Sequence, residues 1–323
     1  MIRAVNLKKG FLNTDKIFKI AVTLAATYVL VILALMVFEL ATGSFPVLEK
    51  EGFSFFTGSD WNAVEERESF GAAPYILGTL VTAGLAMAMG VPVSIGIAMF
   101  LSELAPKFIR EPLSFVIELL AAVPSVIYGL WGLFLFRLYF KDWIEVPLHN
   151  MFGNSIWFFS GTPFGLDIFT ASVILAIMII PTISSVSREI MLAVPNSQRE
   201  AAYMLGATKW EVFKMAVIPY SKSGLIGASI LGLGRAVGET MAVTMLIGNA
   251  TGESAFPQSL FKAGQTMSSI IANEFNEAST VGLHVHALIG IGLILFVVAM
   301  AINIVAHLLV SRVLKAHEGA VQA

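Results

Sequence analysis

The chain has 323 residues, of which 57% are hydrophobic and only 13% are charged. Soluble domains carry about 25% charged and about 45–50% apolar residues, so this composition excludes an ordinary soluble protein. The net charge of −2 offers no basic surface for nucleic acid, and the absence of cysteine excludes disulfides and thiol catalysis. We therefore expect a multi-pass membrane protein whose function lies in a few polar residues.

Six segments of the chain are apolar and long enough to cross a bilayer, which takes about 20 helical residues. They are too long for the alternating strands of about 10 residues that build membrane barrels. We expect an all-α integral membrane protein with one transmembrane domain over residues 1–323. The expected spans are 17–40, 72–102, 112–138, 168–190, 223–249 and 281–311.

Lysine and arginine are unequally divided between two sets of loops. The N-terminal stretch, the loops after the second and fourth spans and the C-terminus hold 14 of the 20 Lys and Arg residues, whereas the opposite loops hold five. Because basic loops stay in the cytoplasm, we expect both termini and the loop 191–222 to be cytoplasmic. The expected external loops are 41–71, 139–167 and 250–280.

Three charged residues lie inside expected spans, where an ionised side chain costs about 2.5–3.5 kcal/mol on insertion scales. Glu118 lies in the third span, and Arg235 and Glu239 lie four residues apart in the fifth. That spacing would let the last two side chains meet on one face of a continuous helix. The small residues of that face, which allow another helix to approach closely, are Gly224, Ala228 and Gly232.

The Arg235–Glu239 pair has two interpretations. It is either a structural ion pair that closes a helix interface or part of an anion pathway with Arg235 as the cation, and we favour the pathway. Pro124 follows Glu118 in the third span and precedes Ser125. Proline removes a helical hydrogen bond, so this position is either a simple kink or irregular backbone that faces protein or water.

Motifs of enzymes and metal sites are missing from the sequence. No Gly-Lys dipeptide occurs, so ATP hydrolysis through a P-loop is excluded, and no H-E-x-x-H occurs. His284 and His286 would point about 200° apart on a helix, so they would not chelate one metal ion together. We therefore expect no catalytic residue, metal or cofactor in this chain.

The loop between the fourth and fifth spans carries the signals of two short helices. Residues 195–206 read PNSQREAAYMLG, in which a turn and a capping residue precede helix formers and a final glycine. A second short helix is expected from Thr208 to about Val217, before Pro219. Together they predict a compact cytoplasmic projection, here called the knob; taken alone, it could also be an interfacial helix.

The knob sequence resembles the EAA loop of ABC-importer permeases, the binding-protein-dependent family. Glu200-Ala201-Ala202 is followed by three residues and Gly206, and Pro219 closes the pattern. The family usually ends the motif I-x-L-P, where this chain has Ala-Val-Ile-Pro. In that family the loop carries the helix that couples the permease to a cytoplasmic ATPase. The resemblance implies this coupling role for Glu200, Ala201, Ala202 and Gly206.

Further segments are similar to the phosphate-importing branch of these permeases, from about Phe53 to the last span. They are residues 70–75, 103–106, 118–132 (ELLAAVPSVIYGLWG) and 234–240 (GRAVGET). The resemblance implies a type I permease of the inner or plasma membrane. Its partners would be a second, homologous (PstA-like) permease, two ATPase subunits that bind ATP and Mg, and a periplasmic or extracellular phosphate-binding protein.

These observations predict the permease subunit of an ATP-driven phosphate importer. We expect Arg235 to attract the anion, while Glu239 neutralises Arg235 in the empty state or accepts the proton of phosphate. The alternatives are an importer of molybdate, sulfate or phosphonate, an ion-driven secondary transporter, a membrane enzyme and a sensory subunit. The expected pathway residues are Arg235, Glu239, Thr240, Glu118 and Ser125, and the expected packing residues are Gly224, Ala228, Gly232 and Gly238.

Overall fold

The computed structural model describes residues 8–64, 66–153, 155–278 and 282–321. These residues are mostly helical, with one short antiparallel hairpin that pairs Trp61 with Phe70. The strands and the α-helices of the first half are α1 (Lys8–Glu51), α2 (Ser54–Thr57), β1 (Trp61–Asn62), β2 (Ser69–Phe70), α3 (Ala73–Met99), α4 (Lys107–Ala122), α5 (Ser125–Trp131), α6 (Arg137–Phe140) and α7 (Val146–Phe152). Those of the second half are α8 (Ile168–Leu192), α9 (Asn196–Met204), α10 (Lys209–Val212), α11 (Ile218–Gly238), α12 (Met241–Leu246), α13 (Met267–Glu274) and α14 (Leu283–Val321).

Short π-helical and 3₁₀ segments join or extend several of these helices. The π-helical segments are Phe100–Leu104, Gly132–Phe136, Lys141–Glu145 and Phe213–Val217. The 3₁₀ segments are Trp157–Phe159 and Gly252–Ala255.

The all-α membrane fold expected from the sequence is confirmed. Five helices of the described chain are long and apolar enough to cross a membrane, namely α1, α3, α8, α11 and α14 with their adjoining turns. A sixth span results if the bent pair Lys107–Ala122 and Ser125–Phe152 is counted as one. Residue 281, where we expected the last span to begin, lies outside the described residues.

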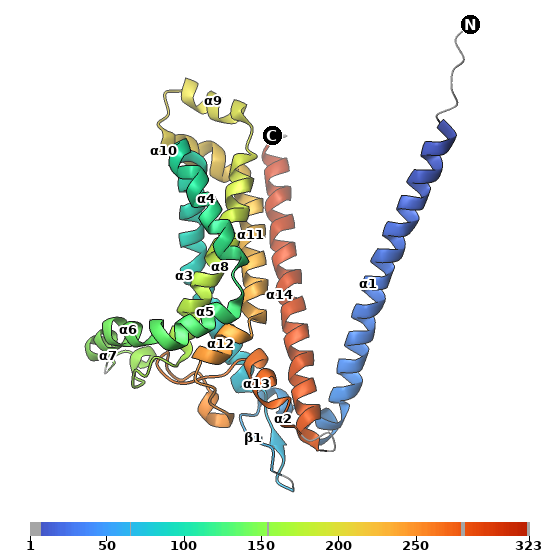
Figure 1. The fold of residues 1–323 in the computed structure, drawn as a ribbon, viewed down its shortest axis with the longest axis vertical. Helices are drawn as coiled ribbons and strands as arrows, with labels where there is room; N and C mark the ends of the chain where they lie inside the picture. The colour runs from blue at the N-terminus through green and yellow to red at the C-terminus, as the bar shows by residue number, and fades with distance from the viewer. Residues whose placement is uncertain (1–7, 65, 154, 279–281, 322–323) are drawn as a thin grey trace.

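The third expected span, 112–138, is not one straight helix. α4 ends at Ala122, and the chain from Ser125 leaves it at an angle of 92°, so that α5, α6 and α7 run crosswise to the long helices, and α6 and α7 extend to the side of the bundle (Figure 1). Pro124 lacks an N–H and has extended backbone, with φ −58° and ψ 138°. The Tyr128 hydroxyl donates to the carbonyl of Leu120 at 2.9 Å, which satisfies an acceptor that the break leaves free.

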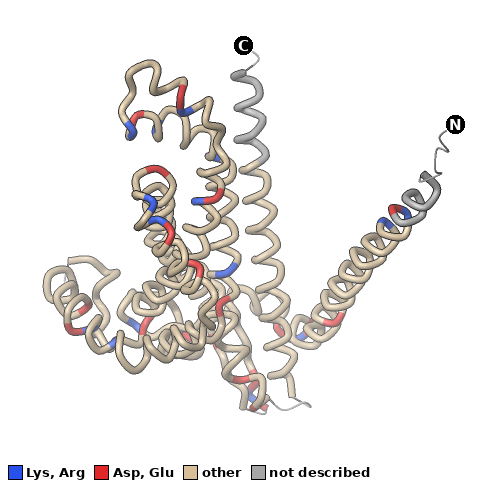
Figure 2. The backbone as a smooth tube through the Cα atoms, turned by 45° about the horizontal axis from the view of Figure 1, so that its top comes forward, with Lys and Arg blue, Asp and Glu red and all other residues tan. Residues whose placement is uncertain are grey.

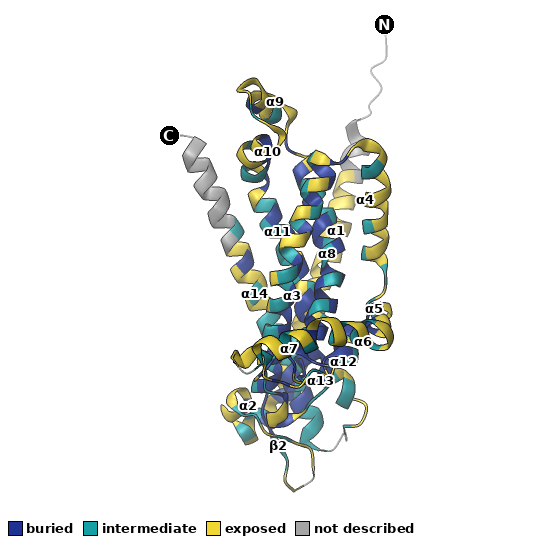
Figure 3. Cartoon of the chain, turned by 90° about the vertical axis from the view of Figure 1, so that its left-hand side faces the viewer, coloured by how far each residue is buried: buried dark blue, intermediate teal, exposed yellow. Residues whose placement is uncertain are grey.

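The core of the bundle forms around α8. Two thirds of its most apolar window (67%) is buried, more than in any other spanning helix of the described chain. Ile174, Ile179 and Ile183 of α8 are fully buried against α3, α11 and α12. The buried residues accordingly concentrate on α8 and the elements around it (Figure 3).

Helix α1 stands away from this core. It contacts α14 near its C-terminal end, where Nδ1 of His286 lies 2.7 Å from the Gly43 carbonyl oxygen, and then diverges (Figure 1). None of its most apolar window is buried. A helix this apolar requires lipid or another protein around it.

The two ends of the bundle differ. α9 and α10 lie at the end where α1 begins and α14 finishes, and the hairpin and α2 lie at the other end (Figure 1). Charged residues are absent from the middle of α1 (Figure 2). The regions expected as external loops contain helical structure, including α7 within 139–167 and α13 within 250–280.

Candidate functional site

Arg235 lies in the last turn of α11 and contacts α8. Its Nη1 donates a hydrogen bond to Thr182 Oγ1 at 2.8 Å, and both residues are partly buried. Thr182 comes 14 residues after the first residue of α8 and ten before the last. The guanidinium therefore meets a spanning helix near its middle, where an ionised group persists mainly with a partner or along a pathway.

The contact depends on the close approach of α11 to α8. A Cβ atom added at Gly232 would lie 2.4 Å from Ile183 Cδ1, and one added at Gly224 would lie 2.6 Å from Ile190 Cγ2. Ala228, one turn from each, is 1% exposed. These three small residues set the separation of the two helices, which fixes how Arg235 reaches Thr182.

The expectation that Arg235 and Glu239 share one helical face is wrong. α11 ends at Gly238, and Glu239 has extended backbone with φ −68° and ψ 124°. Its Oε1 accepts from the Ala242 N–H at 3.3 Å, at the start of α12, where N–H groups lack partners and an anion is favoured. No ion pair joins Arg235 and Glu239 in the described parts of the chain.

Gly238 also differs from its expected packing role. A Cβ atom there would meet no atom within 4 Å. Glycine weakens a helix, and here it lies where the helical backbone stops. Its position therefore favours a role in the break rather than in close helix contact.

Hydroxyl groups hold the chain around this break. Thr240 is partly buried, and its Oγ1 donates to the Gly238 carbonyl at 3.3 Å. Oγ1 of Thr244 donates to the Thr240 carbonyl at 2.7 Å, and Oγ of Ser268, from α13, donates to the Glu239 carbonyl at 2.8 Å. The backbone between α11 and α12 is thus satisfied by side chains, as irregular backbone within a membrane requires.

Glu118 and Ser125 lie on either side of the other break. Glu118 is exposed on α4, and Ser125 is partly buried at the start of α5. Neither forms a hydrogen bond or ion pair with Arg235 within the region that the structure covers. Tyr128, on α5 beyond the same break, donates instead to the Leu120 carbonyl.

Thr182 and Tyr128 were not expected from the sequence. Thr182 directly follows Pro181, and Tyr128 comes four residues after Pro124; both prolines lie within apolar spans. Proline frees a backbone carbonyl, and nearby hydroxyls commonly satisfy such groups in membranes. A hydroxyl close to an intramembrane proline was the signal that could have identified both.

The knob consists of α9, α10 and the π-helical segment that follows. Gly206 ends α9 with φ +82°, a backbone conformation that favours glycine, and Thr208 and Glu211 form a capping box on α10. Glu200 and Ala201 are exposed and Ala202 is 8% exposed. Next to them, the apolar side chains that are most exposed on the knob are Met204 at 88% and Leu205 at 86%.

A buried carboxyl pair lies at the other end of α8. Asp167 caps this helix, since its Oδ1 accepts from the Thr170 N–H at 2.8 Å, and Glu145 accepts from the Thr170 hydroxyl. Both carboxyl groups are fully buried. Burial, and secondarily the charge of Glu145, raises the pKa of Asp167 to about 8. Within the described chain, no group of three or more His, Cys, Asp or Glu could hold a metal ion.

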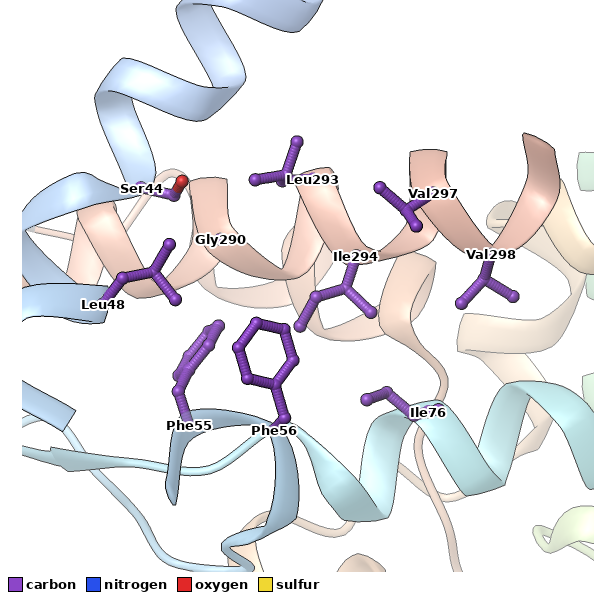
Figure 4. A pocket seen from close by; sticks show the side chains of 10 residues that line it. All are labelled: Ser44, Leu48, Phe55, Phe56, Ile76, Gly290, Leu293, Ile294, Val297 and Val298. Atoms are coloured by element: carbon purple, nitrogen blue, oxygen red, sulfur yellow. The ribbon is translucent and has the colours of Figure 1, made fainter. Parts of the chain in front are cut away.

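A cavity of about 470 Å³ lies between α1, α2, α3 and α14. Figure 4 shows Phe55, Phe56 and Ile76 opposite residues of α14, with Ser44 as the one polar side chain drawn. The Ser44 hydroxyl already donates to the Ala41 carbonyl at 3.0 Å. The lining offers no cation and no free donor, so this cavity does not suit an anion.

The described chain is a bundle of apolar helices, five of which are long enough to cross a membrane, and it therefore belongs to the class of multi-pass membrane proteins. The sequence of residues 90–315 matches the family described as the binding-protein-dependent transport system inner membrane component. The chain belongs to this family, and is a multi-pass protein of the inner membrane. The resemblance that the sequence motifs indicated is thereby confirmed.

Relatives and solved structures agree with this assignment. The chain is 47% identical over 304 residues to the phosphate transport system permease protein PstC of Pasteurella multocida, covering 93% of each chain. It is 46% identical to the PstC protein of Haemophilus influenzae, covering 92% of this chain and 93% of that one. A bacterial ABC transporter involved in alginate import shares the fold, with a TM-score of 0.52, 17% identity, and coverage of 74% of this chain and 78% of the other. The MetNI methionine transporter gives a TM-score of 0.50 and 15% identity, with coverage of 75% and 94%.

Proposed function

We propose that this chain is a permease subunit of an ATP-driven importer that moves inorganic phosphate from an external binding protein into the cytoplasm. The observation that carries the proposal is the contact of Arg235, in the last turn of α11, with Thr182 near the middle of α8; the guanidinium donates to this hydroxyl rather than to a carboxylate. A planar guanidinium binds oxyanions through paired N–H groups. The phosphate transport proteins that match nine tenths of the chain support phosphate as the anion.

The separation of Arg235 from Glu239 simplifies the mechanism. An arriving anion does not have to displace a carboxylate from the guanidinium, because Glu239 instead accepts from the start of α12. Arg235 attracts the anion, Thr182 orients the guanidinium, and Thr240 supplies a hydroxyl close to the break. Glu118 and Ser125 remain candidates for the pathway next to the second break, at Pro124.

Two surfaces of the chain fit the partners of such an importer. The unburied apolar length of α1 fits a second, homologous permease, which would cover a face that the rest of this chain leaves open. The exposed Met204 and Leu205 of the knob fit a groove on one of two cytoplasmic ATPase subunits, which bind ATP and Mg. Glu200, Ala201, Ala202 and Gly206 shape this docking surface.

The experiment is phosphate uptake by the assembled importer in proteoliposomes that contain ATP. Arg235→Gln should lower the initial rate by about tenfold or more, since a hydrogen bond to a charged group contributes about 1.5–3 kcal/mol. Arg67→Gln, which removes an exposed arginine near the hairpin, is the matched control. Near-normal uptake by an Arg235→Gln complex that assembles normally would contradict the pathway role.

The same assay separates the alternatives. Competition by sulfate, molybdate or a phosphonate as strong as that by unlabelled phosphate would point to another oxyanion. Uptake driven by an ion gradient without ATP would point to a secondary transporter. The purified chain alone should hydrolyse no ATP, because the proposal assigns hydrolysis to the partner subunits.

A further inference from the structure

Arg199, in the first turn of α9, donates hydrogen bonds to several partners at the knob end of the molecule. Its Nη2 donates to Glu103 Oε1 at 2.9 Å and to the Met191 carbonyl at 2.7 Å. Its Nη1 donates to the Val194 carbonyl, and its Nε donates to Glu103 Oε1 at 3.3 Å. The Arg199 and Glu103 side chains are only 14% and 13% exposed, so this is not an ordinary surface ion pair.

The partners of Arg199 belong to two different helices. Met191 and Val194 lie at the C-terminal end of α8, where carbonyl groups lack helical partners and the helix dipole favours a cation. Glu103 lies in the π-helical segment that extends α3. One guanidinium therefore ties the first turn of α9 to the ends of both α8 and α3.

Buried packing and a further hydrogen bond stabilise the contact between α9 and the ends of α3 and α8. Met191 and Val194 are 0% and 2% exposed and pack with Phe213 and Val217 of the knob. Arg110 of α4 donates to the Ser102 carbonyl at 2.9 Å, which fixes the same end of α3. A movement of α9 would have to break several buried contacts or carry the ends of α3 and α8 with it.

We propose that the Arg199–Glu103 pair is the joint through which movement of the knob reaches α3 and α8. Both are positioning residues, because they act through the helices that they contact. α8 runs from the Arg199 contact at its C-terminal end to Thr182, which accepts a hydrogen bond from Arg235. The knob contact and the proposed anion site therefore lie on the same helix. The inference rests on the proposed ATP-driven function, because it assigns to that function the contact that transmits force.

A purely structural role makes a different prediction. If Arg199 only caps α8, its replacement would lower stability but leave unchanged the amount of phosphate moved per ATP hydrolysed. If it transmits movement, hydrolysis would continue in the partner subunits while the transport that accompanies it declines. The ratio of phosphate transported to ATP hydrolysed separates these cases.

The test uses the complete importer, with its binding protein, in proteoliposomes. Glu103→Gln removes the ion pair but leaves the contacts of Arg199 with α8. Arg199→Lys keeps the charge but cannot reproduce the planar fork that serves several acceptors. Glu111→Gln and Lys107→Gln are matched controls, because both residues are exposed on the neighbouring α4 and form no ion pair among the residues described.

We expect the transported phosphate per ATP to fall about fivefold or more in Glu103→Gln and in Arg199→Lys, the lower end of usual coupling between sites. The controls should keep the wild-type ratio, and co-purification with the ATPase verifies assembly of every variant. A wild-type ratio in the assembled Glu103→Gln and Arg199→Lys complexes would overturn the inference while leaving the proposed function intact. Absence of ATP-driven phosphate uptake by the wild-type complex would instead overturn the proposed function.

Discussion

Nη1 of Arg235 lies 2.8 Å from Oγ1 of Thr182, and Thr182 is the one side chain that accepts a hydrogen bond from Arg235 within the described residues. The acceptor comes from α8 and the donor from α11, so the packing of these two helices sets the position of the cation. The same α8 reaches the knob at its C-terminal end, through the Met191 carbonyl. The geometry of the proposed anion site and the state of the knob are therefore linked by a single helix.

Replacing Thr182 tests whether its hydroxyl orients the cation. Thr182→Val keeps the shape of the side chain but leaves Arg235 without this acceptor, and we expect phosphate uptake to fall about tenfold, as for loss of one hydrogen bond to a charged group. Thr182→Ser retains the hydroxyl and should restore most of the rate. Initial uptake rates over a range of phosphate concentrations provide the measurement. Equal rates for the Val and Ser variants would argue against the orienting role.

The sequence predicted α8 well, because an uninterrupted apolar run carries its own signal. The expected span was 168–190 and the helix runs over Ile168–Leu192. The prolines did not predict where a helix breaks. Pro92 and Pro181 lie inside α3 and α8, whereas Pro124 lies at a bend of 92°. Tertiary packing decides between these outcomes, since neighbouring groups must satisfy whatever backbone a break exposes.

The candidate site was predicted in part. Arg235 stood out because it is a charge within an apolar run, but the expected partner was wrong. A spacing of four residues brings two side chains together only if the helix continues, and this helix stops at Gly238. Thr182 lies 53 residues away along the chain, so only the folded packing of α8 on α11 could reveal it.

The packing of α11 on α8 gives a prediction on stability. In Gly232→Ala the new Cβ would lie 2.4 Å from Ile183 Cδ1, and Ile183 is fully buried. We expect destabilisation by about 1–3 kcal/mol, as for other overpacked cores. Adding Ile183→Val removes the clashing methyl group and should recover part of the loss.

Gly234 provides the control on the same helix. A Cβ atom there would have no neighbour within 4 Å, so Gly234→Ala should be neutral or stabilise the chain by up to about 1 kcal/mol through helix propensity. Thermal unfolding of the detergent-solubilised protein measures all three variants. A Gly232→Ala variant as stable as Gly234→Ala would show that the two helices separate readily.

The hydrogen bond that Glu239 accepts from α12 and the charge of its carboxylate can be tested separately. Glu239→Gln keeps an oxygen that can accept from the Ala242 N–H, whereas Glu239→Ala removes it. We expect the Ala variant to lose about 1 kcal/mol of stability, as for loss of one hydrogen bond, and the Gln variant to lose less. Phosphate uptake then reports on the charge alone: a near-normal rate in Glu239→Gln would remove the carboxylate from the transport mechanism.

Asp167 gives a prediction on pH dependence. Its pKa is raised to about 8 by burial and by Glu145, from an ordinary value of 3.8. Between these two pH values the folded chain keeps a proton that the unfolded chain has lost. This group therefore lowers the free energy of unfolding as pH rises through that window, with a slope of at most about 1.4 kcal/mol per pH unit, and has no further effect above pH 8.

Asp167→Asn should remove that slope. Asparagine caps helices about as well as aspartate, so the N–H of Thr170 keeps an acceptor, while the buried side chain no longer needs a proton. The stability of the variant relative to wild type should rise from pH 5 to pH 8 and then level off, as measured by thermal unfolding in detergent. Asp142→Asn, whose parent side chain is 68% exposed, is the control and should show no such rise. A stability difference between Asp167→Asn and wild type that is the same at pH 5 and pH 8 would mean that Asp167 is ionised in the folded protein throughout this range.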